Sequence, residues 1–211
     1  TGQIDPIAPV IQVTFSEPMN RTTVESAFSF GGVATGSFSC SGNTVTFTPQ
    51  DALSELTNYV LTIGTNASDV AGNTLTQESI FTVKTGANPG AGDGLAASYY
   101  PSTNFTGTAV TRIDPTVNFN FGTGSPDTEI PIDNFSGRWL GRIQARFDGL
   151  YTFYTFSDDA VRLWVNHQIV IDNWTPHALA ENIGRIALEA GKTYDIKLEY
   201  YEGTINSQIS L

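Results

Sequence analysis

The chain has 211 residues, of which 40% are hydrophobic, so it can bury a packed core in one or two domains, and collagen, coiled coil and general disorder are disfavoured. Twenty-one Asp and Glu against ten Lys and Arg give a formal net charge of −11. Such a chain repels phosphate backbones and anionic lipid headgroups, so we expect cations rather than nucleic acid or membrane surfaces as partners.

Secondary structure is predicted to be β almost throughout. Short runs of alternating Thr, Val, Ile, Phe or Tyr and polar residues end at Gly, Asn, Asp, Ser or Pro. In chain order, the clearest runs are residues 10–15, 44–48, 59–63, 80–84, 151–156, 161–165 and 194–201. Helix signals are weak, and the two candidates, residues 22–27 after Asn20 and residues 51–55, are short. The predicted fold class is therefore all-β, built from sandwiches or barrels.

A glycine-rich stretch at residues 86–94 marks a domain boundary, because it contains no apolar residue larger than Ala or Pro and cannot pack. The sequence therefore predicts two domains. They are residues 1–87 and residues 94–211, joined by a Gly/Pro-rich linker at residues 88–93.

The first predicted domain has about seven short strand signals, which suits a small immunoglobulin-like sandwich. Residues 10–20, 45–49, 59–63 and 69–75 carry a more specific pattern. They resemble the bacterial immunoglobulin-like domains of surface-layer proteins, adhesins and secreted polysaccharide-acting enzymes. This resemblance implies a spacer without catalytic residues. Within residues 69–75, Asp69 and Asn73 either hold a cation or belong to a hairpin turn, and the turn is favoured.

The choice of metals that the chain could bind is limited, because it has one cysteine, Cys40, and two histidines, His167 and His177. They leave no internal disulfide and no zinc site of familiar spacing. Any metal is then expected to be held by oxygen, which favours calcium or magnesium. His167 follows Asn166 where a two-residue hairpin turn is expected, so we interpret it as a turn residue.

The densest signal of the second domain is residues 149–165, where two strands flank a connection that carries Asp158 and Asp159. Loops at the end of a sheet are where sites are usually built. Adjacent carboxylates reach one ion only if the chain turns sharply between them, and calcium accepts such a loop because its coordination geometry is tolerant. From these residues alone, a solvated turn is favoured over a metal site.

A family pattern runs along the whole of residues 94–211. Its positions are Gly94, Leu95, Tyr99, Tyr100, Asn104, Phe105, Gly107, Arg112, Asp114, Pro115, Val117, Phe119, residues 122–126, Asn134, Phe135, Ser136, Arg138, Trp139, Gly141, residues 157–159, 161–165 and 171–174, Gly191, Tyr194 and residues 198–202. Together they resemble the PA-14 domain, a β-sandwich module of yeast flocculins and adhesins, bacterial adhesins and some glycoside hydrolases. The predicted architecture is therefore an immunoglobulin-like sandwich followed by a PA-14-type β-sandwich or barrel.

The PA-14 resemblance implies a set of site residues. In carbohydrate-binding members, two adjacent aspartates joined by a cis peptide hold a calcium ion that also ligates sugar hydroxyls, which implies Asp158 and Asp159 here. An Asn side chain from the loop before the last strand completes the set, and Asn206 is the candidate. Trp174 and His177 are the candidate carbohydrate contacts, although a core or rim position is favoured for Trp174 and a plain loop position for His177.

The resemblance implies a secreted or cell-surface bacterial region that binds glycans or polysaccharides with Ca2+, in the manner of a lectin or adhesin, and that is not an enzyme. A glycosidase is disfavoured because its two acids lie about 5 or 6.5–9.5 Å apart across a sugar, whereas Asp158 and Asp159 share a turn. Two alternatives stay open. They are a non-catalytic accessory module of a secreted glycoside hydrolase and a structural extender that calcium rigidifies.

The chain is also expected to be covalently part of a larger multidomain protein. Its first residues, Thr1, Gly2 and Gln3, include no initiator Met and no signal-peptide pattern. No apolar stretch approaches the about 20 residues of a membrane span, so membrane insertion is not expected.

Overall fold

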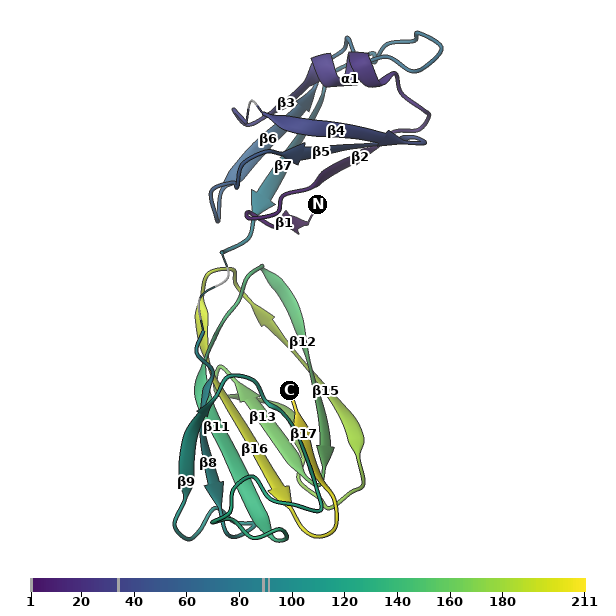
Figure 1. Ribbon diagram of the computed structural model, residues 1–211. Coiled ribbons are helices and arrows are strands. Elements are labelled where there is room, and N and C mark those ends of the chain that lie inside the picture. The colour runs from purple at the N-terminus through teal and green to yellow at the C-terminus, as the bar shows by residue number, and fades with distance from the viewer. Residues whose placement is uncertain (1, 34, 89, 91) are drawn as a thin grey trace. The chain divides into compact units, whose positions relative to one another are not determined.

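Strands make up nearly all the regular structure of the computed structural model, which describes residues 2–33, 35–88, 90 and 92–211 (Figure 1). The all-β prediction is confirmed. The chain divides into two units, residues 1–89 with 146–148, and residues 90–145 with 149–211. Thr1 and Ala34 of the predicted first domain, and Pro89 and Ala91 of the predicted linker, lie outside the described residues. Within the described part of the chain, no helix is long and apolar enough to cross a membrane.

The first unit is a sandwich of two small sheets. The four-stranded sheet has the order β1-β7-β6-β3, formed by Gln3–Ile4, Ser79–Thr85, Asn58–Ile63 and Phe28–Phe30. The three-stranded sheet has the order β2-β5-β4, formed by Ile11–Thr14, Thr44–Pro49 and Gly36–Ser41. Alternate residues of these strands point inward and bury the apolar core. The buried core residues are Ile11, Val24, Phe30, Val45, Phe47, Leu53, Leu61, Ile63 and Ala67.

The first unit holds the helix α1, Arg21–Ala27. Its N-cap is Asn20, whose side chain accepts a hydrogen bond from the backbone N–H of Thr22 at 3.1 Å, so the predicted helix is confirmed. The second predicted helix, at residues 51–55, is wrong, because the segment has a bend at Asp51, a turn at Glu55 and no regular structure between them. Its N–H groups bond outside the segment, as when Leu53 donates to the carbonyl of Pro6 at 2.8 Å.

The hairpin turn expected near residues 69–75 is confirmed. Asn73 donates through its backbone N–H to Oδ1 of Asp69 at 2.8 Å and through its side-chain amide to Oδ2 at 2.7 Å. Both oxygens of Asp69 therefore accept hydrogen bonds inside the turn itself. Gly72 has φ of +93°, a conformation that favours glycine.

The second unit is a larger antiparallel sandwich. Its six-stranded sheet has the order β14-β13-β16-β11-β8-β9, formed by Gln168–Asn173, Val161–Val165, Thr193–Glu202, Phe135–Gln144, Leu95–Tyr100 and Val110–Asp114. Its four-stranded sheet has the order β10-β17-β12-β15, formed by Asn118–Gly122, Ser207–Ser210, Gly149–Asp158 and Ala180–Leu188. In Figure 1, β11, β16 and β13 lie side by side in the larger sheet.

The largest fully buried side chain in the core of the second unit is Trp139. The indole N–H of Trp139 donates to Oδ2 of Asp114 at 2.8 Å, and the Tyr99 hydroxyl donates to the same oxygen at 2.6 Å. Arg112 pairs with the other oxygen at 2.6 Å. This buried carboxylate is therefore paired and hydrogen-bonded, which is what a charge inside a core requires.

The chain crosses from one sheet to the other directly after β12. Because β12 belongs to the four-stranded sheet and β13 to the six-stranded one, Asp159 and Ala160 bridge the two layers at one end of the sandwich. β13 alternates buried and half-buried residues along its length. The hairpin after it turns through Asn166 and His167, with φ of +50° and +62°, so the turn interpretation of His167 is confirmed.

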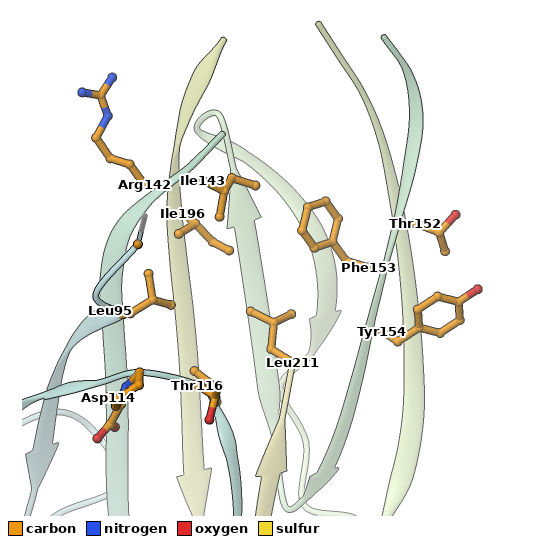
Figure 2. A pocket seen from close by; sticks show the side chains of 14 residues that line it. Leu95, Asp114, Thr116, Arg142, Ile143, Thr152, Phe153, Tyr154, Ile196 and Leu211 are labelled. Atoms are coloured by element: carbon orange, nitrogen blue, oxygen red, sulfur yellow. The ribbon is translucent and has the colours of Figure 1, made fainter. Parts of the chain in front are cut away.

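A cavity of about 550 Å³ lies in the second unit at the end opposite to this crossing. Figure 2 shows Leu95, Ile143 and Ile196 on one side of it and Phe153 of β12 pointing toward them from the other. Its wall is predominantly aliphatic and aromatic. The predicted site residues are absent from this wall, as far as the described residues show.

Candidate functional site

The paired aspartates lie where β12 ends, and the Asp158–Asp159 peptide is cis. Asp158 is half-buried and Asp159 is buried. Both line a pocket of about 370 Å³, together with His177 and Asn206. Four of the five predicted site residues are thus brought to one place, although they come from three separate segments of the chain. The remaining lining residues are Pro176, Ala178, Thr204 and Ile205.

The carboxylate of Asp159 links two loops. Its Oδ1 accepts a hydrogen bond from the backbone N–H of His177 at 2.9 Å, and its Oδ2 accepts one from the backbone N–H of Gly203 at 2.8 Å. Hydrogen bonds from an N–H group to a charged carboxylate are stronger than those between two neutral groups. Asp159 therefore holds the loop before β15 and the loop before β17 against the end of β12.

The surroundings of Asp158 disfavour its charged form. Burial and the neighbouring charge of Asp159 raise the pKa of Asp158, while His177 and a hydrogen bond from the backbone N–H of Leu179 act in the opposite direction. Two carboxylates held this close repel each other. A cation between them would relieve that repulsion.

Beneath the pair, the Tyr200 hydroxyl donates to the main-chain carbonyl of Asp158 and lies 3.1 Å from Oε2 of Glu202. The Glu202 side chain is fully buried, and its Oε1 has no hydrogen-bond partner among the described residues. Burial raises the pKa of Glu202 to about 7. The one proton of the Tyr200 hydroxyl is therefore shared between two acceptors, the carbonyl of Asp158 and Oε2 of Glu202.

Glu202 was not among the predicted site residues. The signal that could have found it is the alternation of β16, in which Ile196, Leu198 and Tyr200 face the core and Glu202 continues the same register. An acidic residue at a core-facing position is informative, since charged side chains are seldom fully buried unless they are paired.

The loop between β16 and β17 lines the pocket through residues 204–206. It is anchored where the backbone N–H of Ile205 donates to Oδ1 of Asp133 at 3.1 Å and the backbone N–H of Asn134 donates to the carbonyl of Gly203 at 2.9 Å. Ile205 has φ of +88°, an unusual value for a β-branched residue. Asn206 follows it, is exposed and lines the pocket.

The available donors define which cation fits. Across the described residues, no three His, Cys, Asp or Glu side chains are grouped so that they could hold a metal ion. A cation in this pocket would therefore depend on the two carboxylates, the amide oxygen of Asn206, main-chain carbonyls and water. Such an all-oxygen set fits calcium, which takes 6–8 oxygen ligands in flexible geometry.

Trp174 lies outside the lining of this pocket. Its half-buried ring has the Arg162 guanidinium 3.9 Å from its centroid, the Tyr201 ring at 4.9 Å and the stacked Phe105 ring at 5.9 Å. The ring is therefore occupied by side chains of its own domain. The role of Trp174 as a carbohydrate contact stays a prediction.

Each of the two units matches a known protein family. Residues 92–211 match the model described as the PA14 domain. The chain belongs to the PA14 domain family. Residues 3–85 match the model described as a bacterial Ig-like domain, which precedes the PA14 domain in the chain. Both resemblances read from the sequence are confirmed.

Curated relatives match through roughly half of the chain. Anti-sigma-I factor RsgI3 of Acetivibrio thermocellus is 46% identical over 113 residues, which is 54% of this chain and 18% of that protein. Protective antigen of Bacillus anthracis is 32% identical over 110 residues, 51% of this chain and 14% of that protein. The chain thus spans under a fifth of the curated relatives it matches.

Among solved structures, an anti-sigma factor domain-containing protein is 42% identical with a TM-score of 0.55, covering 56% of this chain and 41% of that one. A PA14 sugar-binding domain from an RTX adhesin is 17% identical with a TM-score of 0.44, covering 56% of this chain and 88% of that one. The second likeness is low and carries no argument about function.

Proposed function

We propose that the PA14 domain binds carbohydrate through a calcium ion and that the Ig-like domain spaces it within a secreted or cell-surface bacterial protein. The observation that carries this proposal is the pocket that gathers Asp158, Asp159 and Asn206 from distant parts of the chain. Bacterial relatives of the two domains support the bacterial, extracellular setting. In this proposal the chain binds and does not catalyse.

The residues have distinct roles in this proposal. Asp158 and Asp159 supply the negative charge for the ion, and Asn206 supplies a neutral oxygen. Calcium, when bound, would supply ligation of sugar hydroxyls. Asp159 also orients both loops through its hydrogen bonds to His177 and Gly203, so the walls that meet the sugar are fixed before the sugar arrives.

The test begins with calorimetric titration of calcium into the chain, followed by glycan binding with calcium and with excess chelator. We expect calcium binding in the wild type and its loss in Asp158→Asn and Asp159→Asn, because each removes a ligand charge. Glycan binding should require calcium. Asp172→Asn is the matched control, since Asp172 is an exposed aspartate of the same domain outside the pocket. Glycan binding that survives both chelator and the Asp158→Asn change would refute the proposal.

A second candidate function is a structural extender that calcium rigidifies. The hydrogen bonds of Asp159 to the two loops favour it, because an ion at Asp159 would stabilise both loops. It predicts a calcium-dependent rise in the unfolding temperature without any glycan binding. Because a single open site binds sugars weakly, the glycan assay should use a multivalent display of the chain on beads.

A further inference from the structure

The strand that ends at the paired aspartates carries an exposed aromatic row. Side chains alternate along β12, so Tyr154 and Phe156 share the outer face with Asp158. Thr155 and Ser157, which lie between them, are fully buried, whereas Tyr154 is 48% exposed and Phe156 is 41% exposed. Figure 2 shows this alternation, with Phe153 pointing into the sandwich and Thr152 and Tyr154 pointing to the opposite side of the strand.

The neighbouring strands extend this face on both sides. On β15, Ile183 pairs with Tyr154 and Glu181 pairs with Phe156. On β17, Ser210 pairs with Phe156 and Gln208 pairs with Asp158. Paired residues of adjacent strands project to the same side, so the two rings are bordered by hydroxyl, amide and carboxylate groups. We call the set Tyr154, Phe156, Ile183, Gln208 and Ser210 the outer β12 face.

Further apolar side chains are exposed on or beside the same two strands. Besides the two rings, Leu150 is 66%, Leu179 52% and Ile183 50% exposed, all on β12, on β15 or directly before β15. Groups of exposed apolar side chains are a common feature of ligand-binding surfaces. By the alternation of β12 and β15, Tyr154, Phe156 and Ile183 point away from the core, so core packing does not account for their apolar character.

The chemistry of the outer β12 face suits a sugar chain. Aromatic rings present flat apolar surfaces to the C–H faces of sugar rings, and the amide of Gln208 and the hydroxyls of Tyr154 and Ser210 match sugar hydroxyls. Alternate residues of a strand lie about 6.8 Å apart, so Asp158, Phe156 and Tyr154 form a line of evenly spaced contacts. The net charge of −11 disfavours an acidic glycan.

We propose that the domain binds a neutral oligosaccharide or polysaccharide chain, with one sugar unit at the Asp158 and Asp159 pocket and the following units along β12 over Phe156 and Tyr154. This inference rests on the proposed function, because it takes the calcium-dependent pocket as the start of the track. It adds that the ligand is a chain and that the two rings supply further subsites.

The experiment compares saccharide length. Glucose, xylose and galactose, and the tetrasaccharides cellotetraose, xylotetraose and β-1,4-galactotetraose, are titrated with calcium into the wild type, Tyr154→Ala, Phe156→Ala and Phe81→Ala. Phe81 is the matched control, a phenylalanine of the Ig-like domain that is 42% exposed. All variants remove exposed side chains, and cooperative thermal unfolding checks that each is folded.

The expected result is a tetrasaccharide that binds about tenfold or more tightly than its own monosaccharide, since each stacked ring contributes a modest gain. Tyr154→Ala and Phe156→Ala should remove that gain while leaving calcium affinity and monosaccharide binding unchanged, and Phe81→Ala should change nothing.

Three outcomes would overturn the inference. If a monosaccharide binds as tightly as its tetrasaccharide, the pocket works alone and the proposed function stands without the track. If calcium binds but no saccharide does, the proposed function fails as well. If Phe156→Ala instead abolishes a dimer seen by sedimentation without changing the length dependence, the face serves self-association.

Discussion

Oδ2 of Asp159 accepts a hydrogen bond from the backbone N–H of Gly203 at 2.8 Å. The two residues are 44 positions apart, and their contact joins the crossing between the sheets to the loop that precedes the last strand. A carboxylate in this place therefore has two roles. It supplies charge to the pocket, and it sets the position of the pocket wall that carries Asn206.

Gly203→Ala tests this coupling. A Cβ at Gly203 would meet Oδ2 of Asp159 at 3.1 Å, so the carboxylate has to move by a few tenths of an ångström. We expect calcium affinity to fall about two- to fivefold, a fraction of the energy of a hydrogen bond to a charged group, with little change in the unfolding temperature. Calorimetry measures it, and Gly92→Ala is the control, because its Cβ would meet nothing within 4 Å. Unchanged affinity in Gly203→Ala would show that the carboxylate position does not limit binding.

Tyr200→Phe tests the support beneath the pair. The substitution keeps the ring and removes the hydroxyl that contacts the Asp158 carbonyl and Glu202. We expect a loss of about 1–2 kcal/mol in the free energy of unfolding, because buried acceptors lose their partner. Urea denaturation measures it. The double variant with Glu202→Gln should be non-additive, since the two groups share one network. Additive losses would contradict that network.

Glu202 predicts a pH dependence of stability in the absence of calcium. Its pKa is raised from 4.5 to about 7 by burial, so between these values the folded state keeps a proton that the unfolded state has released. The free energy of unfolding contributed by this group therefore falls as pH rises through that window. Urea denaturation from pH 4 to 8 should show the decline in the wild type and a shallower one in Glu202→Gln. Equal slopes in both proteins would assign the decline to other groups.

Replacing Asp114, which lies outside the pocket, should strongly lower the free energy of unfolding. Asp114→Ala leaves the Tyr99 hydroxyl and the Trp139 N–H without their shared acceptor in a buried site, and it removes the ion-pair partner of Arg112. We expect a loss of about 3–5 kcal/mol in the free energy of unfolding. Asp195→Asn is the control, because its ion pair with Arg142 is exposed and should be worth less than about 1 kcal/mol. A similar small effect of both substitutions would refute the assignment of Asp114 as a core anchor.

The local pattern predicted much of this fold. Alternation located the strands because a half-buried strand repeats every two residues, and the Asn166 and His167 turn followed from the same rule. The helix expected at residues 51–55 does not form, and two of its backbone donors bond outside the segment, Leu53 to the carbonyl of Pro6 and Ser54 to the hydroxyl of Tyr59. Local propensity does not contain those partners.

The candidate site divides in the same way. From residue type and spacing alone, a solvated turn is favoured at Asp158 and Asp159. The family resemblance makes these two and Asn206 a candidate calcium site, and His177 is a candidate only through its place in a nearby loop. Only the tertiary structure brings these residues to one pocket and leaves Trp174 against Arg162 and other rings.

By itself, the sequence determined the all-β class, the two families and the acidic pair, since these depend on residue order and short-range geometry. The tertiary structure decided that β12 and β13 belong to different sheets, that Glu202 lies buried beneath the pair, and that Tyr154 and Phe156 continue the face of Asp158. The physical reason is that strand pairing and burial join residues far apart in the chain, and one-dimensional patterns do not specify which strands will meet.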